Sequence, residues 1–226
     1  MTKTMAFLDT ADIGVCSLLE SNYATIRDEY STFKTEYLYN ESRENFDVDD
    51  SAIWELWQEG HRSSLDSAKK NEVYSDLNWD EHTIVPVKKS PNWYGLSIDD
   101  MGIWEGITLA TRVTTPFTLT STPVCDRWFP QTLSILKGHT GSVITSATIA
   151  VFPANKIIPR HNGYETITRI HLPLYVPTGD IGFCVGEETR SWRTGTCLAF
   201  NDIIEHNAWN NTDKDRIALI VDIMKR

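Results

Sequence analysis

Residues 165–176 read ETITRIHLPLYV and residues 197–206 read CLAFNDIIEH, and both stretches lie in the part of the chain that decides the fold. From Gly141 onward, short runs of β-branched and apolar residues follow one another, with turn sequences between them. We expect strands over five ranges: 142–152, 165–176, 181–185, 197–200 and 217–223. Strands at this spacing, with no helical pattern between them, predict an antiparallel sandwich or barrel.

The N-terminal part of the chain has a different period. Six apolar and aromatic residues recur at steps of four and three between residues 16 and 37, which predicts an amphipathic helix packed on the main domain: Leu19, Tyr23, Ile26, Tyr30, Phe33 and Tyr37. We also expect a helix over 51–60, a strand over 83–87, loop and edge strand over 107–122, and a short helix over 127–136. The chain is therefore predicted to be mainly β, with a helical region at 1–82 packed on a β core at 83–226, as one structural unit.

Composition is that of a globular protein. The chain has 226 residues, of which 41% are hydrophobic and 23% charged. No apolar run reaches the roughly 18 residues of a membrane span, so we expect no membrane partner. The N-terminus has no signal-peptide pattern, and the four cysteines are widely spaced without a C-x-x-C pair. These features predict a cytoplasmic protein with buried, reduced thiols.

The charge is unevenly distributed along the chain. Residues 1–100 carry 20 acidic and 9 basic residues, whereas residues 101–226 carry 11 acidic and 12 basic residues. No basic face is available to compensate phosphates, so we expect no nucleic-acid partner. The near-neutral second half is the better place for a small anionic ligand.

Two histidines lie where a ligand has access. His161 follows a strand that ends at Pro159 and precedes Asn162 and Gly163, and His206 follows another predicted strand end. Neutral imidazole binds Fe(II), Zn(II) and Cu(II). The common non-haem iron site adds a carboxylate two residues after the first histidine, but position 163 here is glycine. The residues alone leave the identity of the metal open, and the other histidines (His61, His82, His139) are read as structural or surface residues.

Cationic side chains accompany these histidines. Arg169 and His171 are two residues apart on a predicted strand, so they point to the same face. Arg216 opens the last strand, ten residues after His206. An arginine that points into a barrel requires an anion, because an unpaired buried charge is costly. That anion is either a ligand carboxylate, which the guanidinium matches with two parallel hydrogen bonds, or an internal aspartate such as Asp222.

The order of these elements resembles the aspartyl/asparaginyl β-hydroxylase family of Fe(II)- and 2-oxoglutarate-dependent oxygenases. The shared motifs run from about residue 143 to 222: His161-Asn162-Gly163, Arg169-Ile170-His171-Leu172-Pro173-Leu174, Gly195 through Phe200-Asn201-Asp202 to His206, and Arg216 through Val221-Asp222. This family is similar in having glycine where related oxygenases have the carboxylate ligand. The resemblance implies a double-stranded β-helix, or jelly roll, with its site inside.

By the same resemblance, His161 and His206 are the iron ligands and the catalytic centre. Arg216 is implied to bind the distal carboxylate of 2-oxoglutarate, and Arg169 and His171 to contact the carboxylate beside the keto group. The chain departs from the family pattern at three points. Arg160 is inserted before His161, Asn201 replaces an aspartate, and the small polar residue that helps to bind the distal carboxylate falls near Thr148 or Ile149.

The implied activity is hydroxylation of an unactivated C–H bond, with Fe(II), 2-oxoglutarate and O2 and with release of succinate and CO2. We expect the substrate to be an amino acid, an amino-acid-derived small molecule or a peptide, with Arg160, Trp209 and Asp99 as candidate substrate contacts. One alternative is a halogenase, since a site without the carboxylate has room for chloride. A non-enzymatic β-sandwich that binds a small molecule is the other. The sequence does not predict the oligomeric state.

Overall fold

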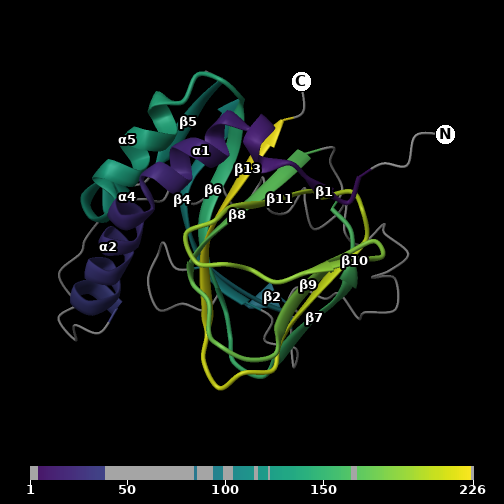
Figure 1. Ribbon diagram of the computed structural model, residues 1–226. Coiled ribbons are helices and arrows are strands. Elements are labelled where there is room, and N and C mark those ends of the chain that lie inside the picture. Colours follow the sequence, from purple (N-terminus) through teal and green to yellow (C-terminus); the bar gives the residue numbers. More distant parts are fainter. Residues whose placement is uncertain are drawn as a thin grey trace.

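The protein was analysed as a computed structural model, which describes residues 5–38, 84–85, 94–98, 104–114, 117–121, 123–163 and 167–224. Two antiparallel sheets face each other across a barrel-shaped interior (Figure 1). The larger sheet contains nine strands: β1 (Phe7–Leu8), β11 (Leu198–Asn201), β8 (Ile167–Tyr175), β13 (Arg216–Met224), β6 (Ile144–Phe152), β4 (Trp104–Thr114), β3 (Tyr94–Ile98) and β2 (Ile84–Val85) in spatial order, with β5 (Phe117–Ser121) paired to β4. The smaller sheet has the order β10 (Glu188–Arg190), β9 (Ile181–Val185), β12 (His206–Asn210) and β7 (Lys156–His161).

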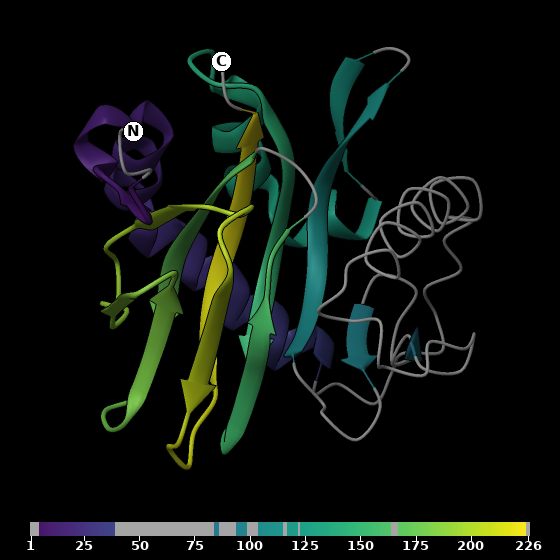
Figure 2. The same ribbon diagram turned by 90° about the vertical axis from the view of Figure 1, so that its right-hand side faces the viewer.

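The chain winds between the two sheets as it moves toward the C-terminus. Strands β6, β8, β11 and β13 belong to the larger sheet, and β7, β9, β10 and β12, which alternate with them in sequence, belong to the smaller sheet. This alternation is the double-stranded β-helix, and it confirms the predicted mainly β fold with N-terminal helices. Figure 2 shows the long strands of the larger sheet from the side, with β13 running at its centre.

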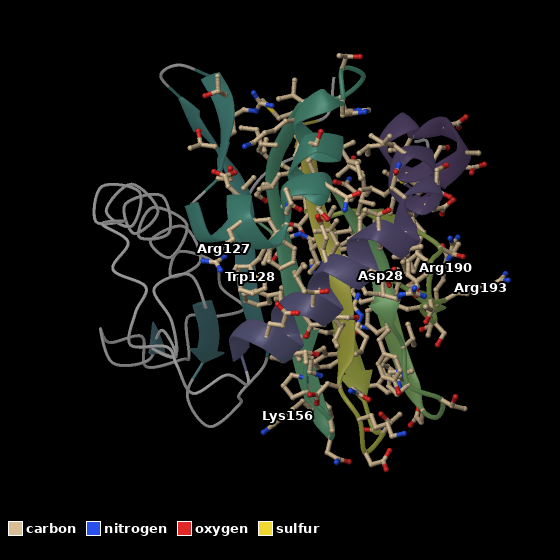
Figure 3. All side chains as sticks on the ribbon, turned by 90° about the vertical axis from the view of Figure 1, so that its left-hand side faces the viewer. Asp28, Arg127, Trp128, Lys156, Arg190 and Arg193 are labelled. Atoms are coloured by element: carbon tan, nitrogen blue, oxygen red, sulfur yellow. The ribbon has the colours of Figure 1, made fainter. Side chains whose placement is uncertain are left out.

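The helices cover the outer face of the larger sheet (Figures 1 and 3). They are η1 (Thr10–Asp12), α1 (Gly14–Ser21), α2 (Tyr23–Phe33), η2 (Lys34–Leu38), α4 (Pro123–Trp128) and α5 (Pro130–Gly138). A continuous apolar core joins their buried side chains, such as Leu19, Ile26 and Phe33, to the outward-facing side chains of the sheet. None of the described helices has the length and apolar content required to cross a membrane.

Alternation along each strand sorts side chains between this core and the barrel interior. On β8, Ile170, Leu172 and Leu174 belong to the core under the helices, so the intervening Arg169 and His171 face the barrel. On β13, Ile217, Leu219, Val221 and Ile223 belong to the same core, which leaves the side chains of Arg216 and Asp222 on the barrel side. A second, smaller cluster inside the barrel is rich in phenylalanine and includes Phe183 and Phe200.

The predicted helix over 16–37 is interrupted in the structure. Helix α1 ends before Asn22, whose backbone leaves the helical region and whose side-chain amide donates to the carbonyl of Leu18 at 2.8 Å. The chain then resumes as α2 and continues into the π-helical turn η2. Asparagine competes for backbone hydrogen bonds in this way. On α2, Ile26, Tyr30 and Phe33 of the predicted stripe are buried.

Two further elements differ from the prediction, and a third lies outside the described residues. Strand β4 is not at a sheet edge, since it pairs with both β3 and β6. The single helix expected over 127–136 is two helices, α4 and α5, separated at Phe129. The helix expected over 51–60 lies outside the described residues. All four cysteines are described and all are free thiols; Cys16, Cys125 and Cys197 are buried, whereas Cys184 is half-buried.

Candidate active site

Two histidines meet across the pairing of β7 and β12. His161 ends β7 and His206 begins β12; the two residues are partners in the strand register, and their ring centroids lie 4.2 Å apart. Each ring is held by its own strand. His161 Nδ1 lies 2.8 Å from the carbonyl oxygen of Pro159, and His206 Nδ1 lies 2.7 Å from that of Ile204. Since a carbonyl only accepts, both Nδ1 atoms carry the proton, so each Nε2 atom carries the lone pair that can bind a metal.

Both imidazoles are neutral around neutral pH. The pKa of His206 is lowered to about 3, chiefly by burial and also by the neighbouring His161. Burial also lowers the pKa of His161, although the bond to the Pro159 carbonyl opposes this effect. Because a metal binds the unprotonated nitrogen, this pair is prepared for a cation. Among the described residues, no group of three or more His, Cys, Asp or Glu side chains is arranged to hold a metal, so the protein would supply two imidazoles.

Asp202 fills the place of the missing third ligand. A Cβ atom added at Gly163 would overlap the Asp202 carboxylate, and the backbone N–H of Gly163 donates to the Asp202 carbonyl at 2.8 Å. The Asp202 Oδ1 atom lies 3.7 Å from His206 Nε2. A side chain at position 163 would therefore displace the Asp202 carboxylate. The carboxylate beside the histidines is that of Asp202, four residues before His206, and not one at position 163.

Arg169 is held by two carboxylates. Its Nε and a terminal nitrogen donate to the two oxygens of Asp222 at 2.8 Å and 3.0 Å, and its other terminal nitrogen lies 2.8 Å from Asp202 Oδ1. Asp222 also accepts a hydrogen bond from Ser146 at 3.0 Å. The internal salt bridge to Asp222, considered above for Arg216, is thus made by Arg169. This arginine fixes the Asp202 carboxylate beside the two histidines.

Arg216 lies deeper in the barrel and has no carboxylate partner among the described residues. Its side chain is 3% exposed, and its Nε atom is buried without a hydrogen-bond partner. Burial lowers its pKa to about 9, so it stays cationic at neutral pH. Its guanidinium lies over the ring of Trp192, 4.1 Å from the ring centroid. A buried cation in this state is prepared for an anion that enters from outside.

His171 connects Arg216 to Trp192. Its Nδ1 atom lies 3.1 Å from a terminal nitrogen of Arg216 and accepts a hydrogen bond from the Trp192 indole N–H at 3.1 Å. Two donors aimed at one nitrogen require a lone pair there, so the proton of the neutral ring is on Nε2. Burial and the positive charge of Arg216 lower the pKa of His171 well below its ordinary value. His171 is therefore a neutral ring with one N–H left to donate.

The structure brings His161, His171, His206, Arg169 and Arg216 together inside one barrel. His206 follows the end of β11, as expected, and it also begins a further strand. Strand β12, which it opens, was not predicted from the sequence. Of the two positions considered on β6, Ile149 belongs to the core under the helices, and Thr148 faces the barrel, with its hydroxyl 3.4 Å from that of Thr108.

Two of the three candidate substrate contacts, Trp209 and Arg160, lie away from the two histidines. Trp209 lies on the opposite face of β12 from His206, where its ring covers Gly182 and its N–H donates to Asp180 at 2.7 Å. Arg160 is exposed and pairs with Glu205 at 2.7 Å. Asp99 lies outside the described residues. A residue adjacent to a barrel-facing histidine points outward by strand alternation, which explains the position of Arg160.

Sequence reasoning gave no role to Trp192 or Asp202, and it named Asp222 only as a possible salt-bridge partner of a barrel-facing arginine. Trp192, Asp202 and Asp222 contact the predicted cationic residues directly. Asp202 and Asp222 belong to the matched motifs, so their acidic side chains next to cationic positions were a usable signal. Trp192 lies in a turn-rich stretch without strand periodicity, and its only signal was a large aromatic residue among polar ones.

Comparison with known proteins agrees with this geometry. The sequence model of the family described as Aspartyl/Asparaginyl beta-hydroxylase matches residues 20–226. An ornithine lipid ester-linked acyl 2-hydroxylase of Rhizobium tropici is 39% identical over 85 residues, which are 36% of this chain and 30% of that protein. The human aspartyl/asparaginyl beta-hydroxylase is 27% identical over 95 residues, 42% of this chain and 12% of that protein.

The matched segments thus cover less than a third of the length of these relatives. Among solved structures, a 2OG-Fe(II) oxygenase family oxidoreductase from Burkholderia pseudomallei is similar over 57% of this chain and 71% of that chain, with 11% identity and a TM-score of 0.41. The family match covers most of the chain, including every residue of the barrel site described above. The chain belongs to the aspartyl/asparaginyl β-hydroxylase family.

Proposed function

We propose that this protein is an Fe(II)- and 2-oxoglutarate-dependent dioxygenase that hydroxylates an unactivated C–H bond, with release of succinate and CO2. The observation that carries the proposal is that one barrel contains a site suited to a cation and a site suited to an anion. Two neutral imidazoles present Nε2 atoms that a divalent cation can bind, and a buried guanidinium without a carboxylate partner among the described residues offers a place for an anion. A metal-chelating dicarboxylate satisfies both.

The residues present fit both groups. His161 and His206 would hold Fe(II), which suits imidazole and leaves coordination positions for water, 2-oxoglutarate and O2. Arg216 would bind the distal carboxylate of 2-oxoglutarate, because its Nε is buried and unsatisfied. The Nε2–H of His171 would donate to the carboxylate beside the keto group. When bound, the iron supplies the oxidative chemistry, and the protein supplies ligation, orientation and exclusion of water.

Arg169 contributes differently from the role that the family resemblance implied. Its guanidinium is engaged by Asp222 and Asp202, so its direct effect is to orient the Asp202 carboxylate toward the metal-binding face of His206. A carboxylate at that place accepts hydrogen bonds from water. We infer that Asp202 holds a water molecule next to the two imidazoles, where a carboxylate ligand would otherwise lie.

The same carboxylate favours hydroxylation over halogenation. A halogenase requires a chloride site in the space that the glycine leaves open. Here the Asp202 carboxylate occupies the space next to Gly163, and a chloride ion would meet a negative charge at short range. Product masses measured in chloride buffer test this point: a gain of one oxygen supports hydroxylation, and a chlorinated product would refute it.

Only the relatives support a proposal for the substrate class. An amino acid, an amino-acid-derived small molecule or a peptide is our first choice. The Rhizobium relative acts, by its name, on an acyl chain of an amino-acid-derived lipid. A screen for succinate release should therefore include free amino acids, peptides and N-acylated amino acids as separate arms. Turnover of peptides alone would contradict a small-molecule substrate.

The test of the cofactor chemistry is an anaerobic titration of Fe(II) and 2-oxoglutarate into the metal-free protein. We expect a visible charge-transfer band that requires both components and is absent from His161→Ala. His139→Ala is the matched control, because His139 lies at the end of α5 and accepts a hydrogen bond from the backbone of Ser142. A folded wild-type protein without the band, or an equal band in His161→Ala, would refute the assignment.

A further inference from the structure

We propose that Trp192 is a positioning residue for the cosubstrate, which holds Arg216 and His171 in their binding arrangement without neutralising the charge of Arg216. The inference rests on the proposed function, because it concerns how the chain prepares the 2-oxoglutarate site. Trp192 is 6% exposed and lies between β10 and β11, flanked by Arg190 and Arg193, which Figure 3 labels. It was not among the residues predicted from the sequence.

Trp192 uses two different parts of its ring. The face of the indole lies under the Arg216 guanidinium at 4.1 Å, and the indole N–H donates to His171 Nδ1 at 3.1 Å. The face stabilises a cation through the quadrupole of the ring, and the N–H fixes one tautomer of the histidine. One side chain therefore determines the position of the guanidinium and the direction of the histidine N–H.

The ring is itself held firmly. Trp192 stacks on Phe183 with ring centroids 5.4 Å apart and an angle of 20° between the planes. The preceding Ser191 donates its hydroxyl to the carbonyl of Ile181 at 2.7 Å, and the following Arg193 pairs with Thr196 in an isolated β-bridge. The loop is anchored on both sides of the tryptophan. The side chain is thereby kept in the barrel before any ligand arrives.

The two barrel-facing arginines described here differ in how many of their N–H groups are already hydrogen-bonded. Arg169 is held by carboxylates, which use its Nε and both terminal nitrogens. Arg216 is held by the face of Trp192 and by one nitrogen of His171, and its Nε has no partner. An aromatic face leaves the in-plane N–H donors available, whereas a carboxylate occupies them. The arginine over the tryptophan is thus the one that keeps its donors for an external carboxylate.

The consequence is a specific dependence on the distal carboxylate of the ligand. 2-Oxoglutarate has that carboxylate, and 2-oxopentanoate has a methyl group at the same end. If Trp192 positions Arg216, its loss should weaken binding of 2-oxoglutarate much more than binding of 2-oxopentanoate, which shares only the carboxylate that His171 would contact. A tryptophan that only fills the core would affect both ligands equally.

The experiment is calorimetric titration of each 2-oxoacid into protein loaded with Mn(II) under anaerobic conditions, so that no turnover is required. For Trp192→Leu, which removes the aromatic face and the N–H, we expect 2-oxoglutarate to lose about tenfold or more in affinity relative to 2-oxopentanoate, whose own affinity falls only a few-fold. For Trp192→Phe, which keeps a ring face and removes the N–H, we expect both 2-oxoacids to bind a few-fold more weakly, because His171 would contact the carboxylate that they share. Trp209→Phe is the matched control, since it removes an indole N–H on the outer face of β12.

Different results would overturn the role of Trp192 and the cosubstrate site itself. Unchanged 2-oxoglutarate affinity in Trp192→Leu would overturn the positioning role, and so would an equal loss for both ligands. If Trp192→Leu does not fold, Trp192→Phe decides, because unchanged affinity for both ligands in that variant would also overturn the role. A wild-type protein that binds neither 2-oxoacid, or binds both equally, would instead refute the proposed cosubstrate site itself.

Discussion

Replacing Arg216 by methionine should have opposite effects on ligand binding and on the stability of the ligand-free protein. The variant removes a buried cation and keeps a long, unbranched side chain. Most substitutions of a buried residue destabilise a protein. This one removes a charge whose Nε lacks a partner and whose guanidinium has no carboxylate beside it among the described residues.

The magnitude follows from the pKa of Arg216. Burial lowers this pKa from 12.5 to about 9, and at roughly 1.4 kcal/mol for each pKa unit the buried charge costs about 5 kcal/mol. The stacking on Trp192 offsets about 2 kcal/mol, and the hydrogen bond to His171 offsets about 1.5 kcal/mol. We therefore expect the unfolding free energy of the metal-free, ligand-free protein to stay equal or to rise by about 1–2 kcal/mol. For a chain of this size, that is a rise in Tm of roughly 2–8 °C.

Ligand binding should change in the other direction. A charge-assisted contact contributes about 1.5–3 kcal/mol, so the dissociation constant of 2-oxoglutarate should increase about 10- to 150-fold in Arg216→Met. Urea denaturation of the metal-free protein measures the first effect, and calorimetric titration in the presence of Mn(II) measures the second. Arg169→Met is the comparison, because it leaves the carboxylates of Asp202 and Asp222 without their cation and should lower stability.

The reasoning would be refuted if the ligand-free Arg216→Met protein lost as much stability as Arg169→Met. Arg216 would then be a structural arginine, and its buried charge would not be reserved for a ligand. Equal 2-oxoglutarate affinity in wild type and Arg216→Met would lead to the same conclusion, whatever the effect on stability.

Two further predictions concern stability. The Glu29 carboxylate accepts hydrogen bonds from the backbone N–H groups of Gln131 and Thr132 and from the Thr132 hydroxyl, at the start of α5. Glu29→Ala should therefore lower the unfolding free energy, measured in urea, by about 2–3 kcal/mol without changing the affinity for 2-oxoglutarate. A loss of stability below about 0.5 kcal/mol would contradict the capping role. The metal-free protein should also lose stability as the pH falls from about 6.5 toward 3. The pKa of His206 in the folded protein is about 3, and the pKa of His171 is also depressed, so the unfolded chain takes up protons at a higher pH than the folded protein does. If the urea midpoint depended on pH equally in wild type and in His206→Gln, His206 would not be a source of the acid sensitivity.

Periodicity predicted the barrel well because strand alternation leaves a direct record in the sequence. Arg169 and His171 alternate with Ile170 and Leu172, so the pattern alone gave the correct face for both residues. The strands of the smaller sheet were harder to find. Strand β12 reads HNAWN and carries polar residues on both faces, so no apolar alternation marks it, and the prediction missed that His206 begins a strand.

The contacts that a side chain makes are harder to predict from sequence than the face of the sheet on which it lies. The sequence placed Arg169 and Arg216 on barrel-facing positions and left open which of them pairs with Asp222. The strand register decides, because Asp222 lies opposite Arg169 on β8 and Arg216 lies six residues earlier on β13. The role of Trp192 depends on contacts with residues 21 and 24 positions away on two other strands, which no local pattern encodes.

The distribution of charge in the barrel gives a final reason to read these residues as one site. At the histidine end, the single positive charge of Arg169 meets the two carboxylates of Asp202 and Asp222, which leaves one excess negative charge beside the imidazoles. At the deeper end, Arg216 leaves one excess positive charge. A divalent cation and a dicarboxylate add equal and opposite charges, and each arrives at the end that attracts it. We therefore expect each of the two ligands to bind more tightly when the other is present, because together they leave the buried groups closer to neutrality than either does alone.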